Sequence, residues 1–555
     1  MKRNGGLEAV YGWCFLFFLL VMFASSASPA AEPLSNLRTV ALSGNQAPGT
    51  PAGALFTSYS APHIDDFGRV GFIGRMSTGA GGVNSGNDSA FFLERAGSLE
   101  LIAREGDQAP GTPANAKFDE LNTSGFQSGF AISNTSHAAF DAQLVSGSGG
   151  VTASNRYGIW SNSGGDVALL ARLGDQAPGA PSGAEFEALS RPALNGIGKK
   201  IFFGRMREDT GGVLLSNNEG IWSDRDGPVA LVIRENTPVP GAPDGTRFGD
   251  FSTTVRMNDA GQLAFAASLR LNGAPVGEAV WTEQNGALKL VAQTGTQAPG
   301  APAGTNFTDV NPPIINALGQ AAFHSFLTDN DDFPTLNHGI FMDQGDALRL
   351  VARQGGQPPG LPEGARFSSV SGTFSLNDLG QVAFVAADDV SGVGIWSEGS
   401  GTLKQITHRD AMAPGTTDGV GFSVFTELAF NNAGQVAFLA DRGTQGNGIW
   451  AQDRSGELKA IAFRGMQLDV DDGPGVDLRT VQSITFFGGA SNVRGQSSAF
   501  NDLGQVAFVA SFTNGTRGVF VSNIVAVIPE PSCAALLLLV GGLGLNLRLR
   551  APRAV

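Results

Sequence analysis

Four arginines stand at equivalent places in a repeated sequence and would suit the binding of anions. Each follows the third predicted strand of its repeat: Arg104, Arg172, Arg234 and Arg353. On one face they would form a positive arc, because a guanidinium group can bond a carboxylate of an acidic polysaccharide through two nitrogens. We favour the alternative that each arginine pairs with an acidic residue of a neighbouring repeat.

Two acidic loops interrupt the repeated pattern. One holds Asp329, Asp331 and Asp332, and the other has the sequence DVDDGPGVD with Asp469, Asp471, Asp472 and Asp477. Alternating carboxylates followed by glycine suit an oxygen-rich calcium shell, but the bidentate glutamate of an EF-hand loop is missing. We favour a solvated loop, and calcium is the one cofactor that the sequence suggests.

Histidine-based catalysis has little support in the sequence. The five histidines are scattered, and no HExxH, GxSxG or GxxxxGK motif accompanies them. His63 with Asp65 and Asp66, and His324 with His338 and Asp331, come nearest to a metal-assisted hydrolase. We therefore assign no catalytic residue and expect a protein that is not an enzyme.

Charge and cysteine content exclude several classes of protein. The 50 acidic residues outnumber the 36 basic ones, for a net charge of -14, so the surface repels phosphate backbones and nucleic acid is not an expected partner. The two cysteines, Cys14 and Cys533, lie in terminal apolar segments. This placement excludes a disulfide framework and a cysteine-based zinc site in the region between them.

The elements that must position these residues repeat eight times. Each copy has an Asn-x-x-Gly-x-x-x-Phe motif or a variant of it, and successive copies are 68, 62, 63, 58, 61, 54 and 70 residues apart. Such a period indicates an array or a propeller, in which each unit buries its apolar faces on its neighbours. The copies are Asp65, Gly68 and Phe72; Ser133, Ser136 and Phe140; Asn195, Gly198 and Phe202; Asn258, Gly261 and Phe265; Asn316, Gly319 and Phe323; Asn377, Gly380 and Phe384; Asn431, Gly434 and Phe438; and Asn501, Gly504 and Phe508.

Four apolar phrases per repeat predict an all-β, eight-bladed β-propeller, with about 60 residues and four strands per blade. The repeat region opens with a third strand (39–42) and a fourth (around Phe56), and closes with a first (506–510) and a second (519–521). In a ring these two half units would join as one blade and bury both exposed sheet edges. We favour a structural role for the asparagine as the start of an Asx turn, for the glycine as a residue of positive φ, and for the phenylalanine and tryptophan as core residues.

Both ends of the chain resemble export signals. Lys2 and Arg3, the apolar stretch 13–24 and the small residues 25–31 are typical of a secretory signal peptide over residues 1–31, followed by the propeller at 35–525. Residues 528–555 contain Pro529, Glu530 and Pro531, an apolar run at 533–547, and Arg548 and Arg550. This tail resembles the PEP-CTERM sorting signal of exopolysaccharide-producing Gram-negative bacteria. The resemblance implies processing by an exosortase, a C-terminal transmembrane segment, and a final location in the cell envelope or the extracellular matrix.

The repeats resemble envelope tandem-repeat proteins that carry this motif, a resemblance that implies no activity. From these observations we expect an exported binding or structural protein of the extracellular polysaccharide matrix, with exopolysaccharide or envelope proteins as partners. The alternative is a calcium-dependent hydrolase or lyase that acts on a polysaccharide or a lactone at the mouth of the channel.

Overall fold

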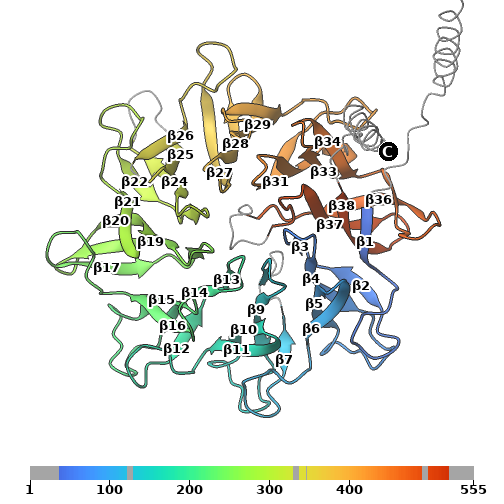
Figure 1. The fold of residues 1–555 in the computed structure, drawn as a ribbon, viewed down its shortest axis with the longest axis horizontal. Helices are drawn as coiled ribbons and strands as arrows, with labels where there is room; N and C mark the ends of the chain where they lie inside the picture. The colour runs from blue at the N-terminus through green and yellow to red at the C-terminus, as the bar shows by residue number, and fades with distance from the viewer. Residues whose placement is uncertain (1–36, 122–128, 329–336, 346, 490–497, 524–555) are drawn as a thin grey trace, which may run out of the picture.

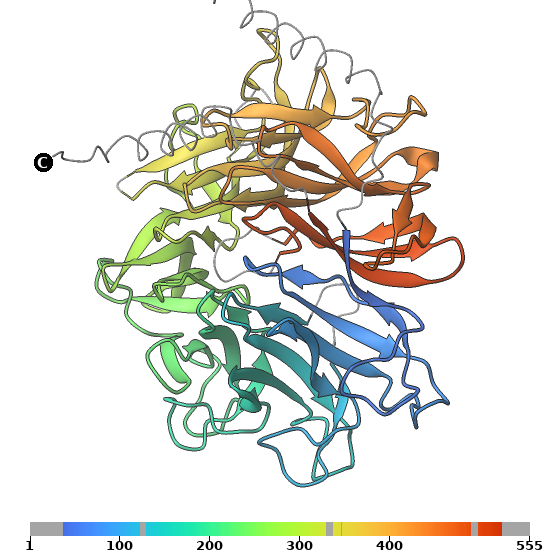
Figure 2. The same cartoon turned by 45° about the vertical axis from the view of Figure 1, so that its right-hand side comes forward.

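The computed structural model describes residues 37–121, 129–328, 337–345, 347–489 and 498–523. They form eight antiparallel sheets arranged around a central axis, which confirms the predicted eight-bladed β-propeller (Figure 1). The turned view shows successive blades stacked beside one another around the ring (Figure 2). The predicted signal peptide and sorting tail lie outside the described residues.

Each blade contains four main strands, and in blades 1 to 5 the innermost one is split in two. Blade 1 has β2 (Phe56–Tyr59), β3 (His63–Ile64), β4 (Val70–Met76), β5 (Ser89–Arg95) and β6 (Ser98–Arg104). Blade 2 has β7 (Phe118–Glu120), β8 (Phe130–Ile132), β9 (Ala138–Leu144), β10 (Tyr157–Gly164) and β11 (Asp166–Arg172). Blade 3 has β12 (Phe186–Leu189), β13 (Ala193–Leu194), β14 (Lys200–Met206), β15 (Glu219–Ser223) and β16 (Ala230–Arg234). Blade 4 has β17 (Thr246–Phe251), β18 (Arg256–Met257), β19 (Leu263–Leu271), β20 (Ala274–Gln284) and β21 (Ala287–Gln293).

The remaining blades have the same plan. Blade 5 has β22 (Phe307–Val310), β23 (Ile314–Ile315), β24 (Ala321–Leu327), β25 (Asn337–Asp343) and β26 (Leu348–Arg353). Blade 6 has β27 (Phe367–Leu376), β28 (Val382–Asp388), β29 (Gly392–Ser397) and β30 (Lys404–His408). Blade 7 has β31 (Val424–Phe430), β32 (Val436–Asp441), β33 (Asn447–Gln452) and β34 (Leu458–Phe463). Blade 8 has β35 (Gln467–Asp469), β36 (Leu478–Thr485), β37 (Gln505–Phe512), β38 (Arg517–Asn523) and, from the other end of the chain, β1 (Leu37–Leu42).

Proline explains part of the division of the inner strand. In blades 1, 3 and 5 the break falls at Pro62, Pro192 and the pair Pro312 and Pro313. Proline cannot donate to the hydrogen-bond ladder, so the strand is interrupted there. The inner strands of blades 6 and 7 have no proline and are continuous.

One strand, rather than half a unit, closes the ring. β1 pairs with β38 in antiparallel register, from Leu37 opposite Ser522 to Leu42 opposite Gly518. The strand that begins at Phe56, expected to join the same blade, is instead the inner strand of blade 1 and pairs with β4. The reason is local: the Asn-type turn connects each inner strand to the next strand by a short hairpin, and the hairpin places the two strands side by side.

The motif phenylalanines and the tryptophans form the core of the blades, as the sequence predicted. In blade 3, Phe202 stacks on Trp222 at 6.3 Å between ring centroids, and Phe186 of the inner strand meets Trp222 edge-on at 4.9 Å. The same trio recurs in blade 7, where Phe438 stacks on Trp450 at 6.3 Å. The equivalent phenylalanines of blades 4, 6 and 8 are likewise fully buried: Phe265, Phe384 and Phe508.

Helices contribute almost nothing to the described part of the chain. The one helix there is the single turn Gly443–Gln445, which follows β32 in blade 7. Across the same residues, no helix is long and apolar enough to cross a membrane. The side chains that could form a site are therefore positioned by strands and by the turns between them.

Candidate functional site

The Asn-type turns of successive blades lie next to one another around the central axis, and we call this ring of turns the turn rim. Asn377 represents them: its side-chain oxygen accepts the backbone N–H groups of Leu379 at 3.1 Å and Gln381 at 3.0 Å. Gly380 has a φ of +73° in the same turn, where an L side chain would be strained. The predicted Asx turn and the predicted role of glycine are both confirmed. A positive φ recurs at the same position in blades 4, 7 and 8, at Gly261 (+78°), Gly434 (+77°) and Gly504 (+80°).

The same asparagines also join the blades, which the sequence did not predict. In six blades the buried side-chain amide donates to the main-chain carbonyl oxygen of the corresponding residue one blade further on. We call these bonds the amide ladder. They are Asn195 to Asn258 (3.0 Å), Asn258 to Asn316 (3.0 Å), Asn316 to Asn377 (3.2 Å), Asn377 to Asn431 (3.3 Å), Asn431 to Asn501 (3.1 Å) and Asn501 to Asp65 (2.8 Å).

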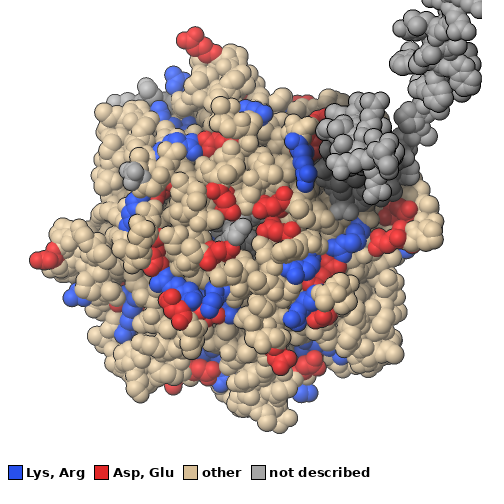
Figure 3. All heavy atoms as spheres, in the orientation of Figure 1, with Lys and Arg blue, Asp and Glu red and all other residues tan. Residues whose placement is uncertain are grey.

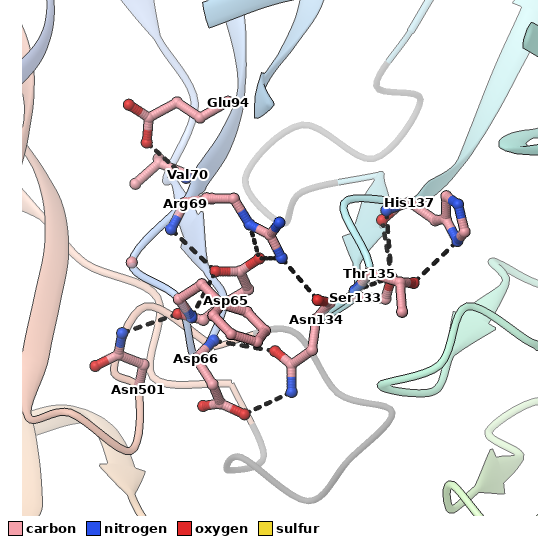
Figure 4. Close-up of polar contacts among 12 residues, drawn as sticks. Asp65, Asp66, Arg69, Val70, Glu94, Ser133, Asn134, Thr135, His137 and Asn501 are labelled. Carbon is pink, nitrogen blue, oxygen red and sulfur yellow. Dashed lines mark hydrogen bonds and ion pairs between the residues drawn. The ribbon is translucent and has the colours of Figure 1, made fainter. Parts of the chain in front are cut away.

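Asp65 and Ser133 stand where other blades have the asparagine, and the hydrogen bonds differ at these two positions (Figure 4). Asp65 has no amide to donate, and Arg69 bonds both its carboxylate and the carbonyl oxygen of Asn134 in blade 2, the latter at 2.7 Å. Burial raises the pKa of Asp65, and the charge and hydrogen bonds of Arg69 oppose that rise. Ser133 is too short to cross to blade 3, and it bonds Thr135 within its own turn at 2.8 Å.

A second set of bonds lies beside the amide ladder and uses the residue after each asparagine. Here a backbone N–H donates to a side-chain oxygen of the next blade, as from Gly196 to Asp259 (2.6 Å) and from Ala317 to Asp378 (2.8 Å). Burial, together with the charge of Asp66, raises the pKa of Asp502 in this set. The remaining bonds are Asp378 to Asn432 (2.7 Å), Asn432 to Asp502 (2.9 Å), Asp502 to Asp66 (3.3 Å) and Asp66 to Asn134 (3.0 Å).

Ion pairs connect neighbouring blades farther from the axis. Arg349 of blade 5 bonds both oxygens of Glu398 in blade 6, at 2.6 and 3.0 Å. Further pairs of this kind are Arg38 with Glu94, Arg225 with Glu283, and Lys289 with Asp343. On the face drawn in Figure 3, acidic side chains gather around the centre of the ring, and basic side chains lie farther out.

The four arginines of the predicted positive arc lie at the opposite end of the strands from the turn rim. Each bonds within its own blade: Arg104 to Asn87 O (2.9 Å), Arg172 to Asp175 (3.1 Å), Arg234 to Asn217 O (2.6 Å) and Arg353 to Gln354 O (2.9 Å). The expected partners, acidic residues of a neighbouring blade, are not the ones found. Only the contact of Arg172 involves a carboxylate, and that carboxylate belongs to Asp175, three residues further along the chain. Binding of an anion by these arginines remains a prediction.

The acidic loop 469–477 lies against the strand that closes the ring. The carboxylate of Asp472 accepts the backbone N–H of Thr39 in β1, at 2.9 Å. Asp469 accepts the N–H groups of Asp471 and Asp477, and Asp471 accepts that of Gly473. Within the described part of the chain, no three His, Cys, Asp or Glu side chains are grouped so that they could hold a metal ion. The second acidic loop, with Asp329, Asp331 and Asp332, lies outside the described residues.

The two histidine sets have different surroundings. His63 is buried, stacked on Phe487 at 5.1 Å and packed against Phe130 at 4.5 Å, and burial lowers its pKa to about 3. His324 bonds His338 through ring nitrogens 3.0 Å apart, and burial lowers the pKa of His324 to about 4. Both pKa values leave the imidazoles neutral near pH 7. Asp331, expected beside the second pair, is outside the described residues.

The chain belongs to a family described as a family of unknown function (DUF7453), which it matches over residues 30–212, 123–276 and 215–535. No curated protein matches the sequence. Among solved structures, the chain is similar to the β-propeller domain of the Trilobed protease from Pyrococcus furiosus, at 12% identity and a TM-score of 0.34, over 73% of this chain and 98% of that one.

Two further solved structures align with a larger share of this chain but with a smaller share of their own chains. PorZ, a surface component of the type-IX secretion system of Porphyromonas gingivalis, is 12% identical with a TM-score of 0.32, over 84% of this chain and 56% of that one. The sialidase of Trypanosoma rangeli is 8% identical with a TM-score of 0.24, over 83% of this chain and 61% of that one.

Proposed function

We propose that this protein is an exported, non-enzymatic binding and scaffolding component of the extracellular polysaccharide matrix. The two terminal segments motivate the location: a secretory signal before the propeller and, after it, a tail that resembles a sorting signal. Under this proposal an exosortase processes the tail near Pro529, Glu530 and Pro531. The mature propeller then works at the cell surface or within the matrix.

The observation that carries the proposal is the amide ladder of the turn rim. The repeated asparagines, which could have been ligands for a substrate or a metal, use their side chains to join blades. Figure 4 shows one of these bonds, from Asn501 to Asp65. A ring joined in this way is a rigid support, which keeps exposed groups at fixed positions and lowers the entropy cost of holding a long polymer.

Co-sedimentation of the purified full chain with matrix polysaccharide from an exopolysaccharide-producing Gram-negative host tests this proposal. We expect retention of the protein by the polymer without any shortening of the polymer over the same incubation. If the polymer is cleaved and the cleavage needs calcium, the protein is instead a hydrolase or lyase. If neither retention nor cleavage occurs with matrix polymer or envelope proteins, the binding role is wrong.

A further inference from the structure

A polar cavity of about 240 Å³ lies between blades 1 and 2, away from the turn rim. Its size is below the roughly 300–1,000 Å³ typical of sites for drug-sized ligands, so it suits a single small unit. Of its nine lining residues, only Ile73 is apolar. Three of the others carry carboxylates, four carry hydroxyl groups, and one is an arginine.

The charges around the cavity favour a cation. The lining includes three acidic residues, Glu105, Asp119 and Glu120, and one basic residue, Arg75. Arg75 also lies 3.5 Å from Asp88, which reduces its ability to neutralise the cavity. Glu105 is only 8% exposed, and its carboxylate accepts the N–H of Ser89 at 3.2 Å. Burial and the charge of Asp88 raise the pKa of Glu105 to about 7, and a cation within hydrogen-bond distance would favour its charged form.

Hydroxyl groups supply a second kind of contact. Ser58, Ser60, Ser89 and Tyr59 line the same space. Ser58 and Ser89 both pair with Arg75 in the sheet of blade 1, so the three side chains share the face toward blade 2. The serine hydroxyls on this face can donate to, or accept from, the oxygens of a ligand. The ring of Tyr59 packs instead against Phe56 and Phe72 on the other face of blade 1.

The size of residue 89 distinguishes this junction from the corresponding one between blades 3 and 4. Ser89 pairs with Arg75 across the sheet, just as Glu219 pairs with Arg205 in blade 3. In blade 3 the longer side chain crosses the junction, where its carboxylate accepts the N–H of Phe251 in blade 4 at 2.8 Å. The small side chain of Ser89 leaves space at the equivalent place, and it borders the cavity.

We propose that this cavity binds a small hydroxylated cation of the amino-sugar class, as a free ligand or as one unit of a cationic polysaccharide. The carboxylates of Glu105, Asp119 and Glu120 would hold the ammonium group, and the serine hydroxyls would bond the ring hydroxyls. This inference rests on the proposed function, which it narrows from matrix polysaccharide in general to polymers with unacetylated amino sugars.

Calorimetric titration of the full chain at pH 7 with glucosamine, N-acetylglucosamine and glucuronate tests the inference. We expect glucosamine to bind at least tenfold more tightly than the other two. Ser89→Glu, which copies the side chain found in blade 3, and Asp119→Asn, an exposed change, should each weaken glucosamine binding at least tenfold. The matched control is Glu235→Gln, which alters the corresponding carboxylate of blade 3 and should leave binding unchanged.

Several results would overturn the assignment. They are equal affinity for glucosamine and N-acetylglucosamine, binding that Ser89→Glu and Asp119→Asn leave intact, or binding of calcium in place of the sugar. Co-sedimentation with matrix polymer separates the two proposals. If the polymer retains the protein but glucosamine does not bind, only the cavity assignment is rejected. If glucosamine binds but no matrix polymer retains the protein, only the matrix function is rejected.

Discussion

The side-chain amide of Asn501 donates a hydrogen bond of 2.8 Å to the carbonyl oxygen of Asp65, a residue 436 positions earlier in the chain. This bond continues the amide ladder across the junction where the two ends of the propeller meet. The pairing of β1 with β38 closes the same junction at its outer side. The ring is therefore closed twice, by a strand near its periphery and by an asparagine near its axis.

Removal of one asparagine of the amide ladder should destabilise the protein. In Asn377→Ala the carbonyl oxygen of Asn431 loses its donor while it stays buried, so we expect a loss of about 1–3 kcal/mol in the free energy of unfolding. Leu379→Ala, at an exposed position in the same turn, is the control and should change it by less than about 0.5 kcal/mol. Urea unfolding measures both, and equal effects would contradict a role for the ladder.

The contributions of Arg69 and Asp65 to the free energy of unfolding should depend on each other. Arg69→Gln leaves the buried Asp65 carboxylate without its cation and Asn134 without its donor, so we expect a loss of about 1.5–3 kcal/mol. The double variant Asp65→Asn with Arg69→Gln restores the motif found in blades 4 to 8 and should recover most of that loss. A double-mutant cycle from urea unfolding measures the coupling. Strictly additive effects would show that the two residues act independently.

Asp472 should stabilise the closing strand. Asp472→Ala removes the acceptor for Thr39, so amide hydrogen exchange in β1 should become faster while exchange in β14 stays unchanged. Asp471→Ala, in the same loop, is the control because its carboxylate bonds Gly473 within that loop. If calcium slows exchange in β1 and Asp472→Ala abolishes that effect, the loop is a metal site.

His63 should make the protein sensitive to acid. Its pKa is about 3 in the folded chain against an ordinary value of 6.5, so the folded state resists protonation that the unfolded state accepts. Stability from this residue is fully present above pH 6.5 and falls as the pH drops toward 3. His63→Gln should reduce that fall, as followed by the melting temperature between about pH 7 and pH 4. An NMR titration of His63 with a midpoint near 6.5 would contradict the explanation.

Much of the fold could be predicted from residues that act locally. The glycines of the turns need a positive φ, the asparagines start Asx turns, and the alternating apolar residues form strands, so the strands and turns of each repeat follow from short-range rules. The order of the phrases at the two ends indicated a closed ring because an open array would leave sheet edges exposed.

Tertiary structure decided the relationships that span whole blades. The strand at Phe56 belongs to blade 1, Arg69 replaces the missing amide of Asp65, and a small Ser89 borders the cavity where blade 3 has a glutamate. Each depends on contacts across neighbouring blades or on which strands lie side by side. Local propensity is the same whichever neighbour is present, so the sequence determined the parts of the ring, and packing determined which side chains join its blades.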